Sequence, residues 1–405
     1  MHVILSHSGK QHAYWLALAL QQNSSLQRFY TSNYYKPDSW PDSLFAKHAR
    51  VSQILQKRYQ EGLCTSLVTR APIFELPELI YRGVFGNNGI TASLVEVRDI
   101  AFDAWISRKL KKNSAQVFWG FQGSCLRSLK AANSAGMLSV AEFATAHVDT
   151  AIRVLSEEAE RHPEWADSIG NLKFFDWYRD RLREEPHHAD YCVAASTYTR
   201  KSLEEVGITP ESIINIPLGA NLSRFHAQPR ELNNTLRVLF VGCLSQRKGL
   251  KYLLQAVKAI KSHKLKLTLV GPRIGSGRGL DEYKGIFDEK GVLHGKALLD
   301  EYYSNDVLVL PSVFEGFGLV IIEAMATGIP VIGSTHTCAP DVIRDGCDGY
   351  VLEPDDVEGL VGKLEKLATN RSLVHELGMN ASKRAQEYSW KQHAKRVALF
   401  LESIA

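Results

Sequence analysis

The chain of 405 residues lacks long apolar runs, paired cysteines and a strong charge of either sign. No apolar run reaches the length of about 18 residues that a membrane span needs. The six cysteines include no C-x-x-C pair and no zinc-ligand spacing, so we expect free or buried thiols in a reducing cytosol. The N-terminus has no basic segment of the kind that opens a signal peptide. These absences favour a cytoplasmic globular protein.

The small net charge also limits the kinds of partner. A formal charge of +4 is low for this length and argues against a nucleic-acid-binding protein with a dense basic face. Hydrophobic residues make up 45% of the chain and charged residues 23%, as in soluble globular proteins. The length is too great for one ordinary core, so two domains are expected.

The second half of the chain alternates short β-branched runs with helical periodicity. The expected strands are 237–242, 265–271, 306–312 and 329–334, and the expected helices are 249–262, 297–304 and 317–327. Alternation of strand and helix at this interval predicts a parallel sheet covered by helices on both faces.

The first half repeats this alternation less regularly. The expected strands are 2–7, 116–119, 138–142 and 191–195, and the expected helices are 13–22 and 197–207. The charged segment 152–188 is interpreted as a solvated helix face, and the polar segment 214–234 as a linker. The predicted fold class is therefore α/β, with two Rossmann-like, doubly wound parallel-sheet domains. They would face each other across a ligand-binding cleft.

One segment, EGFGLVIIEAMATGIPVIGS, carries two glutamates in an otherwise apolar stretch. Glu315 precedes the predicted helix 317–327, and Glu323 lies within it. Gly316 and Gly318 allow the backbone to approach a ligand closely, and a helix N-terminus favours an anion. One interpretation is a phosphate at this helix terminus, with one carboxylate at its mouth and the second on the helix. The other is that Glu315 complements the helix dipole and Glu323 reaches the surface, and the spacing leaves both open.

A basic pair precedes another predicted helix in FVGCLSQRKGL. Lys248 and Arg247 stand just before Gly249, where they could neutralise a diphosphate. The segment is not a Walker A loop, and GPRIGSGRGL does not open a helix as G-x-G-x-x-G does in dinucleotide-binding proteins.

The pattern P-S-x-x-E-G-F-G-L-x-x-x-E-A-M-A-x-G-x-P-V, preceded by G-x-L-x-x-x-K-G, resembles the retaining glycosyltransferases of family 4. The likeness extends over 189–355 and, more weakly, to SHSGKQH and AEFATAH in the first half. It implies the GT-B fold, with an acceptor-side domain at 1–216 and a domain that binds the nucleotide sugar at 217–387. It also implies that the C-terminal helix at 388–405 packs back on the first domain.

The resemblance assigns three residues to catalysis: Glu315 at the hydroxyls of the donor sugar, Lys248 at the diphosphate, and His147 beneath the sugar. It assigns Glu323 to the ribose. The further donor-binding residues that it implies are Arg247, Gly316, Phe317, Gly318, Leu319, Leu293, His294 and Gly9. The family often has arginine directly after the glycine of the first turn, where this chain has Cys243. Either Arg247 or Arg273 could replace it, and the sequence leaves the choice open.

The implied reaction moves a sugar from a nucleotide diphosphate sugar, with UDP favoured, to a hydroxyl acceptor with retention of configuration. The acceptor could be a sugar, a lipid or a small molecule. No D-x-D motif is present, so we expect neither a metal nor a cofactor. The alternatives are a nucleotide-sugar epimerase of the same fold and an inactive module that binds nucleotide sugars. The oligomeric state stays open.

Two predicted helices have an apolar face that could pack on the protein core or contact another surface. In FDAWISRKLKK (102–112), Phe102, Trp105, Ile106 and Leu110 share one face beside a basic one. A core-facing helix is the favoured interpretation, and weak peripheral docking on an anionic membrane is the alternative. At the C-terminus, the predicted apolar face consists of Trp390, Val397, Leu399, Phe400 and Ile404.

Overall fold

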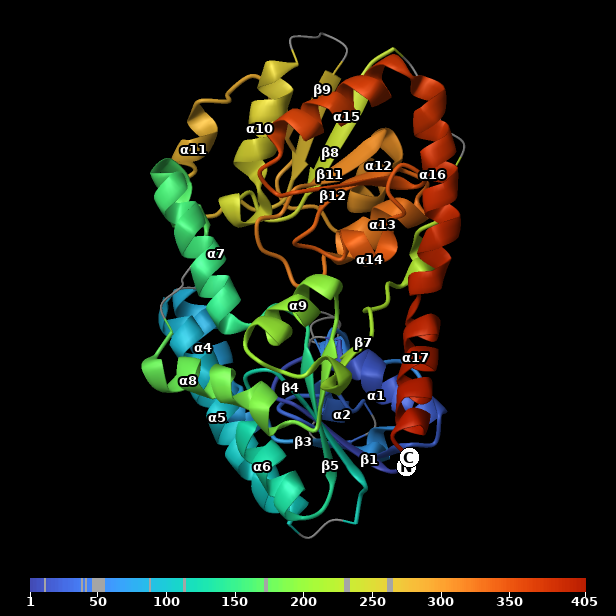
Figure 1. The fold of residues 1–405 in the computed structure, drawn as a ribbon. Helices are drawn as coiled ribbons and strands as arrows, with labels where there is room; N and C mark the ends of the chain where they lie inside the picture. Colours follow the sequence, from blue (N-terminus) through green and yellow to red (C-terminus); the bar gives the residue numbers. More distant parts are fainter. Residues whose placement is uncertain are drawn as a thin grey trace.

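The computed structural model describes residues 1–10, 12–37, 39–40, 42–45, 55–86, 89–111, 114–170, 174–228, 234–260 and 265–405. It contains two parallel sheets with helices around each, one above the other in Figure 1. The predicted fold class is confirmed.

The first sheet has seven strands in the order β3-β2-β1-β4-β5-β6-β7. Their bounds are β1 (Val3–His7), β2 (Leu26–Thr31), β3 (Val68–Arg70), β4 (Val117–Phe121), β5 (Leu138–Phe143), β6 (Tyr191–Ala194) and β7 (Ile213–Asn215). The helices of this half are α1 (Ala13–Gln22), α2 (Asp42–Phe45), α4 (Leu76–Phe85), α5 (Gly89–Leu110), α6 (Leu126–Ser134), α7 (Val148–Arg161), α8 (Asp176–Glu184) and α9 (Thr197–Glu205). Every residue of β1 and β4 is buried, as expected for central strands covered on both faces.

The second sheet has six strands in the order β10-β9-β8-β11-β12-β13. Their bounds are β8 (Leu236–Val241), β9 (Leu265–Val270), β10 (Phe287–Glu289), β11 (Val307–Leu310), β12 (Val331–Ser334) and β13 (Gly349–Leu352). The helices are α10 (Leu250–Ala259), α11 (Arg278–Asp281), α12 (Lys296–Ser304), α13 (Leu319–Ala326), α14 (Ala339–Val342), α15 (Val357–Thr369), α16 (Arg371–Ala385) and α17 (Trp390–Ser403).

Some predicted boundaries shift in the structure. The segment interpreted as a linker from residue 214 begins inside strand β7, while its part at 229–233 lies outside the described residues. The helix expected at 249–262 ends at Ala259, and 261–262 also lie outside the described residues. Helix α13 begins at Leu319 because Gly318 takes a left-handed conformation with φ 88° as its N-cap.

The interpretation of 152–188 as a solvated face is wrong for three of its charged residues. Glu158, Arg181 and Glu185 are buried. Arg181 pairs with the buried Asp103 at 2.6 Å, and Glu185 accepts the backbone N–H of Gly123 at 2.5 Å. Arg181 and Glu185 thus tie the α8 segment to the rest of the first domain, whereas Glu158 on α7 accepts hydrogen bonds from Gln246 and Tyr252 of the second domain. Residues 171–173 of this segment lie outside the described residues.

The basic helix expected at 102–112 is the second half of α5. Phe102, Ile106 and Leu110 are fully buried in the first domain, and the ring of Trp105 packs against those of Phe102 and Phe74. Core packing therefore occupies this apolar face, and it cannot dock on a membrane. Lys112 lies outside the described residues.

Helix α17 leaves the second domain and packs on the first, beside α1 (Figure 1). The ring of Phe400 lies edge-on to Trp119 and Tyr191, and Trp390 stacks on Trp15 with ring centroids 5.2 Å apart. The inclusion of Leu399 in the apolar face was wrong, because Leu399 is 64% exposed. The buried face of α17 instead includes His393 and Leu401.

Candidate functional site

Lys248 and Glu315 meet at the carboxyl edge of the second sheet. Lys248 follows β8, Glu315 follows β11, and these two strands are neighbours. The Lys248 ammonium forms an ion pair with the Glu315 carboxylate. Two residues that are far apart in the sequence thus share one site.

Tight packing of two loops produces this meeting. Gly249 is left-handed, with φ 68°, and a Cβ added there would lie 1.8 Å from the carbonyl oxygen of Pro311. The backbone N–H groups of Val313 and Phe314 donate to the Arg247 carbonyl at 3.0 and 3.1 Å. The glycine therefore allows the Lys248 loop to lie directly against the loop that carries Glu315.

The site is electropositive even though Glu315 is present. Burial and then the neighbouring Arg247 lower the pKa of Lys248 to about 8. The adjoining Glu315 carboxylate acts in the opposite direction, because it favours the charged amine, so Lys248 is an ammonium at neutral pH. The side chain of Arg247 is exposed, and no ion pair joins it to a carboxylate of the described residues. Arg273, the other candidate for the missing arginine, instead pairs with Glu289 at 2.5 Å.

The N-terminus of α13 adds unpaired backbone donors beside this pair. No acidic side chain lies in its first turn, and its first N–H groups lack partners within the helix. Leu319 is exposed, whereas Phe317 is buried and its carbonyl accepts the N–H of Cys338 at 2.8 Å. An anion can therefore reach the helix terminus at Gly318 and Leu319.

Glu323, one turn further along α13, receives a hydrogen bond from the Tyr302 hydroxyl at 3.0 Å. Burial raises the pKa of Glu323, while the Tyr302 hydrogen bond and the charge of Arg224 lower it. The carboxylate of Glu323 therefore has a hydrogen-bond donor within the protein, and the interpretation that Glu323 only reaches the surface is wrong.

His147 comes from the first domain, at the N-cap of α7. It is 1% exposed, and its Nδ1 accepts the backbone N–H of Asp149 at 3.3 Å. Burial lowers the pKa of His147, so the ring is neutral and Nε2 carries its proton. Nε2 is buried and has no hydrogen-bond partner among the residues that the structure describes.

Contacts between the domains bring the His147 segment to the Glu315 loop. A Cβ added at Gly316 would lie 2.0 Å from the carbonyl oxygen of Ala144 and 2.8 Å from the Cα of Thr145. The Ser196 hydroxyl also donates to the Gly316 carbonyl at 2.9 Å. The segment just before His147 therefore lies against the Glu315 loop.

The remaining predicted residues lie on loops that follow strands of the two sheets. Leu293 follows β10 at the same sheet edge and packs on the second core, whereas His294 is exposed. Gly9 follows β1 in the first domain, and its N–H donates to Nδ1 of His7 at 2.7 Å. The donor-binding roles of these three residues stay predictions.

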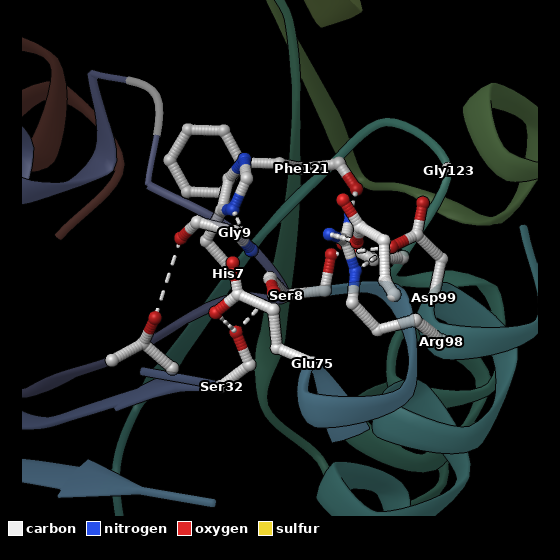
Figure 2. A network of polar contacts seen from close by, with 12 residues as sticks. His7, Ser8, Gly9, Ser32, Glu75, Arg98, Asp99, Phe121 and Gly123 are labelled. Carbon is white, nitrogen blue, oxygen red and sulfur yellow. Dashed lines mark hydrogen bonds and ion pairs between the residues drawn. The ribbon is translucent and has the colours of Figure 1, made fainter. Parts of the chain in front are cut away.

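A buried polar network beside Gly9 was not predicted (Figure 2). The Ser8 hydroxyl donates to Asp99 at 2.6 Å and the Ser32 hydroxyl to Glu75 at 3.0 Å. Arg98 joins the network by pairing with both Asp99 and Glu78. Its members come from four separate segments, so no local motif marks them.

No three His, Cys, Asp or Glu side chains among the described residues gather closely enough to hold a metal ion. None of the helices in the described ranges is long and apolar enough to cross a membrane.

Comparison with known sequences finds one family match and several relatives. Residues 223–384 match the family described as "Glycosyl transferases group 1". A D-inositol 3-phosphate glycosyltransferase of Rhodococcus erythropolis is 30% identical over 51% of this chain and 52% of its own length. An uncharacterized glycosyltransferase of Methanocaldococcus jannaschii is 32% identical over 39% of this chain and 42% of its own. The matches thus span about half, or less, of these relatives.

Solved structures match the whole chain in fold. A crystal structure of Anabaena HepE with UDP and glucose has a TM-score of 0.64 at 15% identity, and covers 100% of both chains. A sucrose-phosphate synthase of Thermosynechococcus elongatus has a TM-score of 0.65 at 19% identity, over 100% of this chain and 99% of its own. The chain therefore has the GT-B fold, and its second domain carries the sequence pattern of the group 1 glycosyl transferases.

Proposed function

We propose that the protein is a retaining glycosyltransferase that uses a nucleotide diphosphate sugar, with a UDP-sugar favoured, and needs no metal. One observation carries the proposal: Lys248, Glu315 and the open N-terminus of α13 share one sheet edge, against the segment of the first domain that ends at His147. The match of residues 223–384 to the group 1 glycosyl transferases, and the likeness in fold to a protein solved with UDP and glucose, support it.

The cations of the site suit a departing diphosphate. Lys248, Arg247 and the amides at the start of α13 would stabilise the negative charge that develops as the bond to the sugar breaks. Arg247 is the better substitute for the arginine missing at Cys243, because Arg273 is committed to Glu289. These fixed positive charges can take the place of a metal ion at the diphosphate.

The carboxylates would bind the donor. Glu323 would accept hydrogen bonds from the ribose hydroxyls, and Glu315 from the sugar hydroxyls. Nε2–H of His147 would donate to the sugar from the other side, because this buried group has no partner among the described residues. Glu315 would act as a binding group and not as a nucleophile, because the proposed transfer on one face of the sugar forms no bond to the protein.

Both the departing phosphate and the acceptor would lie on the same face of the sugar, so the anomeric configuration is retained. The anomeric carbon to phosphate-oxygen bond breaks, and the acceptor oxygen forms its bond from the same side. The acceptor's proton passes to the departing phosphate oxygen, so the protein needs no separate base.

Turnover of nucleotide sugars tests this function. We expect the protein to release UDP from a UDP-sugar with EDTA present, and proton NMR to show a product with the donor's anomeric configuration. Lys248→Ala should lower the rate of release about a hundredfold, as loss of one charge-stabilising donor does in other enzymes. Arg273→Ala, which removes a cation already paired with Glu289 at an exposed position, is the matched control and should change the rate less than about twofold.

Three results would contradict parts of the proposal. Recovery of an epimerised nucleotide sugar without UDP release would indicate the epimerase. A product of inverted configuration would refute retention, and loss of turnover in EDTA would refute metal independence. Binding of UDP without any turnover of the sugars tried would favour the inactive binding module.

A further inference from the structure

The two carboxylate oxygens of Glu323 have different surroundings. Oε2 accepts the Tyr302 hydroxyl at 3.0 Å. Oε1 has no hydrogen-bond partner among the residues that the structure describes, and the side chain is half-buried on α13. Each oxygen of an ionised carboxylate can accept hydrogen bonds. The protein therefore occupies Oε2 and leaves Oε1 available to a ligand.

The hydroxyl that occupies Oε2 is held in a fixed place. Tyr302 lies on α12 and is fully buried in the second core, where its ring packs edge-on to Phe225 with centroids 6.0 Å apart. Burial and then the charge of Glu323 raise the pKa of Tyr302 well above its ordinary value, so its hydroxyl keeps its proton. Tyr302 is thus a permanent donor toward Glu323.

Glu323 has a charged neighbour as well, the guanidinium of Arg224. No ion pair joins the two among the described residues, and a Cβ added at Gly295 would lie 3.8 Å from Nη2 of Arg224. Burial raises the pKa of Glu323, whereas the Tyr302 hydrogen bond and then the charge of Arg224 lower it. Both neighbours favour the ionised carboxylate, but the direct contact that orients it comes from Tyr302.

This orientation matters because the last torsion of a glutamate side chain has only weak preferences of its own. Without the Tyr302 hydroxyl, the carboxylate of Glu323 could rotate, and Oε2 would lose its partner in a half-buried position. An unpaired oxygen of this kind costs free energy and favours protonation. One hydroxyl therefore fixes both the direction and the charge of the group.

We propose that Tyr302 is a positioning residue for ribose recognition: it holds Oε2 of Glu323 so that Oε1 accepts hydrogen bonds from the ribose hydroxyls. The inference rests on the proposed function, in which Glu323 binds the ribose of the donor. Selectivity for a ribonucleotide would then depend on a hydroxyl that does not touch the ligand. The adjacent Tyr303 has no such role, because its hydroxyl donates to the backbone carbonyl of His226 at 3.1 Å.

Calorimetric titration with UDP and with 2′,3′-dideoxy-UDP tests the positioning role. The dissociation constant for dideoxy-UDP should exceed that for UDP about tenfold or more in the wild type, because hydrogen bonds to a charged acceptor are strong. Tyr302→Phe should lower this ratio about threefold or more by weakening the binding of UDP alone. Tyr303→Phe is the matched control and should keep the wild-type ratio, and Glu323→Ala should bring it close to one.

The pH dependence of UDP binding gives a second readout. The affinity should fall toward acid pH as Glu323 gains a proton. This fall should begin at higher pH in Tyr302→Phe, because the variant lacks a hydrogen bond that favours the ionised carboxylate. The phosphate of UDP also titrates, near about pH 6, but it does so alike for every variant. Tyr303→Phe should follow the wild type.

Equal ratios in the wild type and Tyr302→Phe would overturn the inference, because Tyr302 would then only pack α12 against α13. A wild-type ratio near one would also overturn it, since Glu323 would not read the ribose. UDP binding, and with it the proposed function, would stand in both cases. No binding of UDP, GDP or ADP by the wild type would refute the proposed function and the inference together.

Two substitutes keep the test decisive. Should the wild type bind GDP or ADP and not UDP, the dideoxy form of that nucleotide gives the same ratio. Should Tyr302→Phe misfold by circular dichroism, Phe225→Leu serves in its place, because it removes the ring that packs on Tyr302. It should lower the ratio in the same direction, and an unchanged ratio would overturn the inference.

Discussion

At the scale of single residues, Lys248 decides how the site changes when a ligand arrives. In the free protein its ammonium is paired with Glu315. A diphosphate carries more negative charge than one carboxylate, so Lys248 should turn to it and release Glu315 for the sugar hydroxyls. Burial keeps this exchange sensitive to pH, because it lowers the pKa of Lys248 to about 8.

The affinity for UDP should therefore fall as the pH rises through about 8. Above that value the free protein increasingly holds a neutral amine, and binding must first restore its proton. The dissociation constant should then rise toward about tenfold per pH unit, until the pKa of the bound state is reached. Isothermal titration calorimetry between pH 7 and 10 measures this.

Lys248→Arg is the control for the pH dependence. Arginine stays charged over this range. The affinity of the variant for UDP should therefore stay constant over the pH range in which that of the wild type falls. Parallel profiles for the two proteins would show that another group titrates, and that Lys248 does not contact the diphosphate.

The residues of the site divide into those that a local motif marks and those that only the fold assembles. Glu315, Glu323 and Lys248 were predictable because glycine-rich turns and helix starts surround them in sequence. Tyr302, which donates to Glu323, lies on another helix, and its hydroxyl has no local signal. The proposal of Arg247 over Arg273 likewise rests on the ion pair of Arg273 with Glu289, which no local pattern indicates.

At the scale of elements, α17 ties the two domains together through its apolar face. Phe400 is 4% exposed between Trp119 and Tyr191, whereas the adjacent Leu399 points to solvent. The two positions are one residue apart on the same helix. Alanine substitutions at these two positions should change helix propensity to a similar extent, so a difference in their effect on stability reports on packing.

Phe400→Ala should lower the free energy of unfolding by about 3–5 kcal/mol, because it leaves a cavity against two aromatic rings. Leu399→Ala should change it by no more than about 0.5 kcal/mol. Urea denaturation monitored by circular dichroism measures both. Equal losses would mean that α17 does not pack on the first domain as the structure shows.

Some elements that sequence patterns missed have identifiable physical causes. The first half of helix α5 was missed because the helix carries the buried acids Glu96, Asp99 and Asp103 on its inward side, so its hydrophobic periodicity is weak. Tertiary partners such as Arg181 and Ser8 satisfy two of these acids, and they come from distant segments. Strands β3 and β10 have three residues each and lie at sheet edges, where little apolar sequence is needed.

At the scale of the whole molecule, the site depends on how the two domains meet. Ser196 donates to Gly316 at 2.9 Å, the Thr197 hydroxyl donates to Asp341 at 2.5 Å, and Gln246 donates to Glu158 at 2.5 Å across the domains. These contacts hold the Lys248 and Glu315 loops against the segment of the first domain that ends at His147. A ligand bound there should stabilise both domains together.

The measurement that tests the central claim most directly is the melting temperature with UDP, in the wild type and in Lys248→Ala and Glu323→Ala. UDP at about a hundred times its dissociation constant should add roughly 2.7 kcal/mol to the stability of the wild type, a clear rise in melting temperature. Both variants should lose most of that rise. A rise that both variants keep would place the nucleotide elsewhere, and no rise with UDP, GDP or ADP would contradict a nucleotide site at this sheet edge.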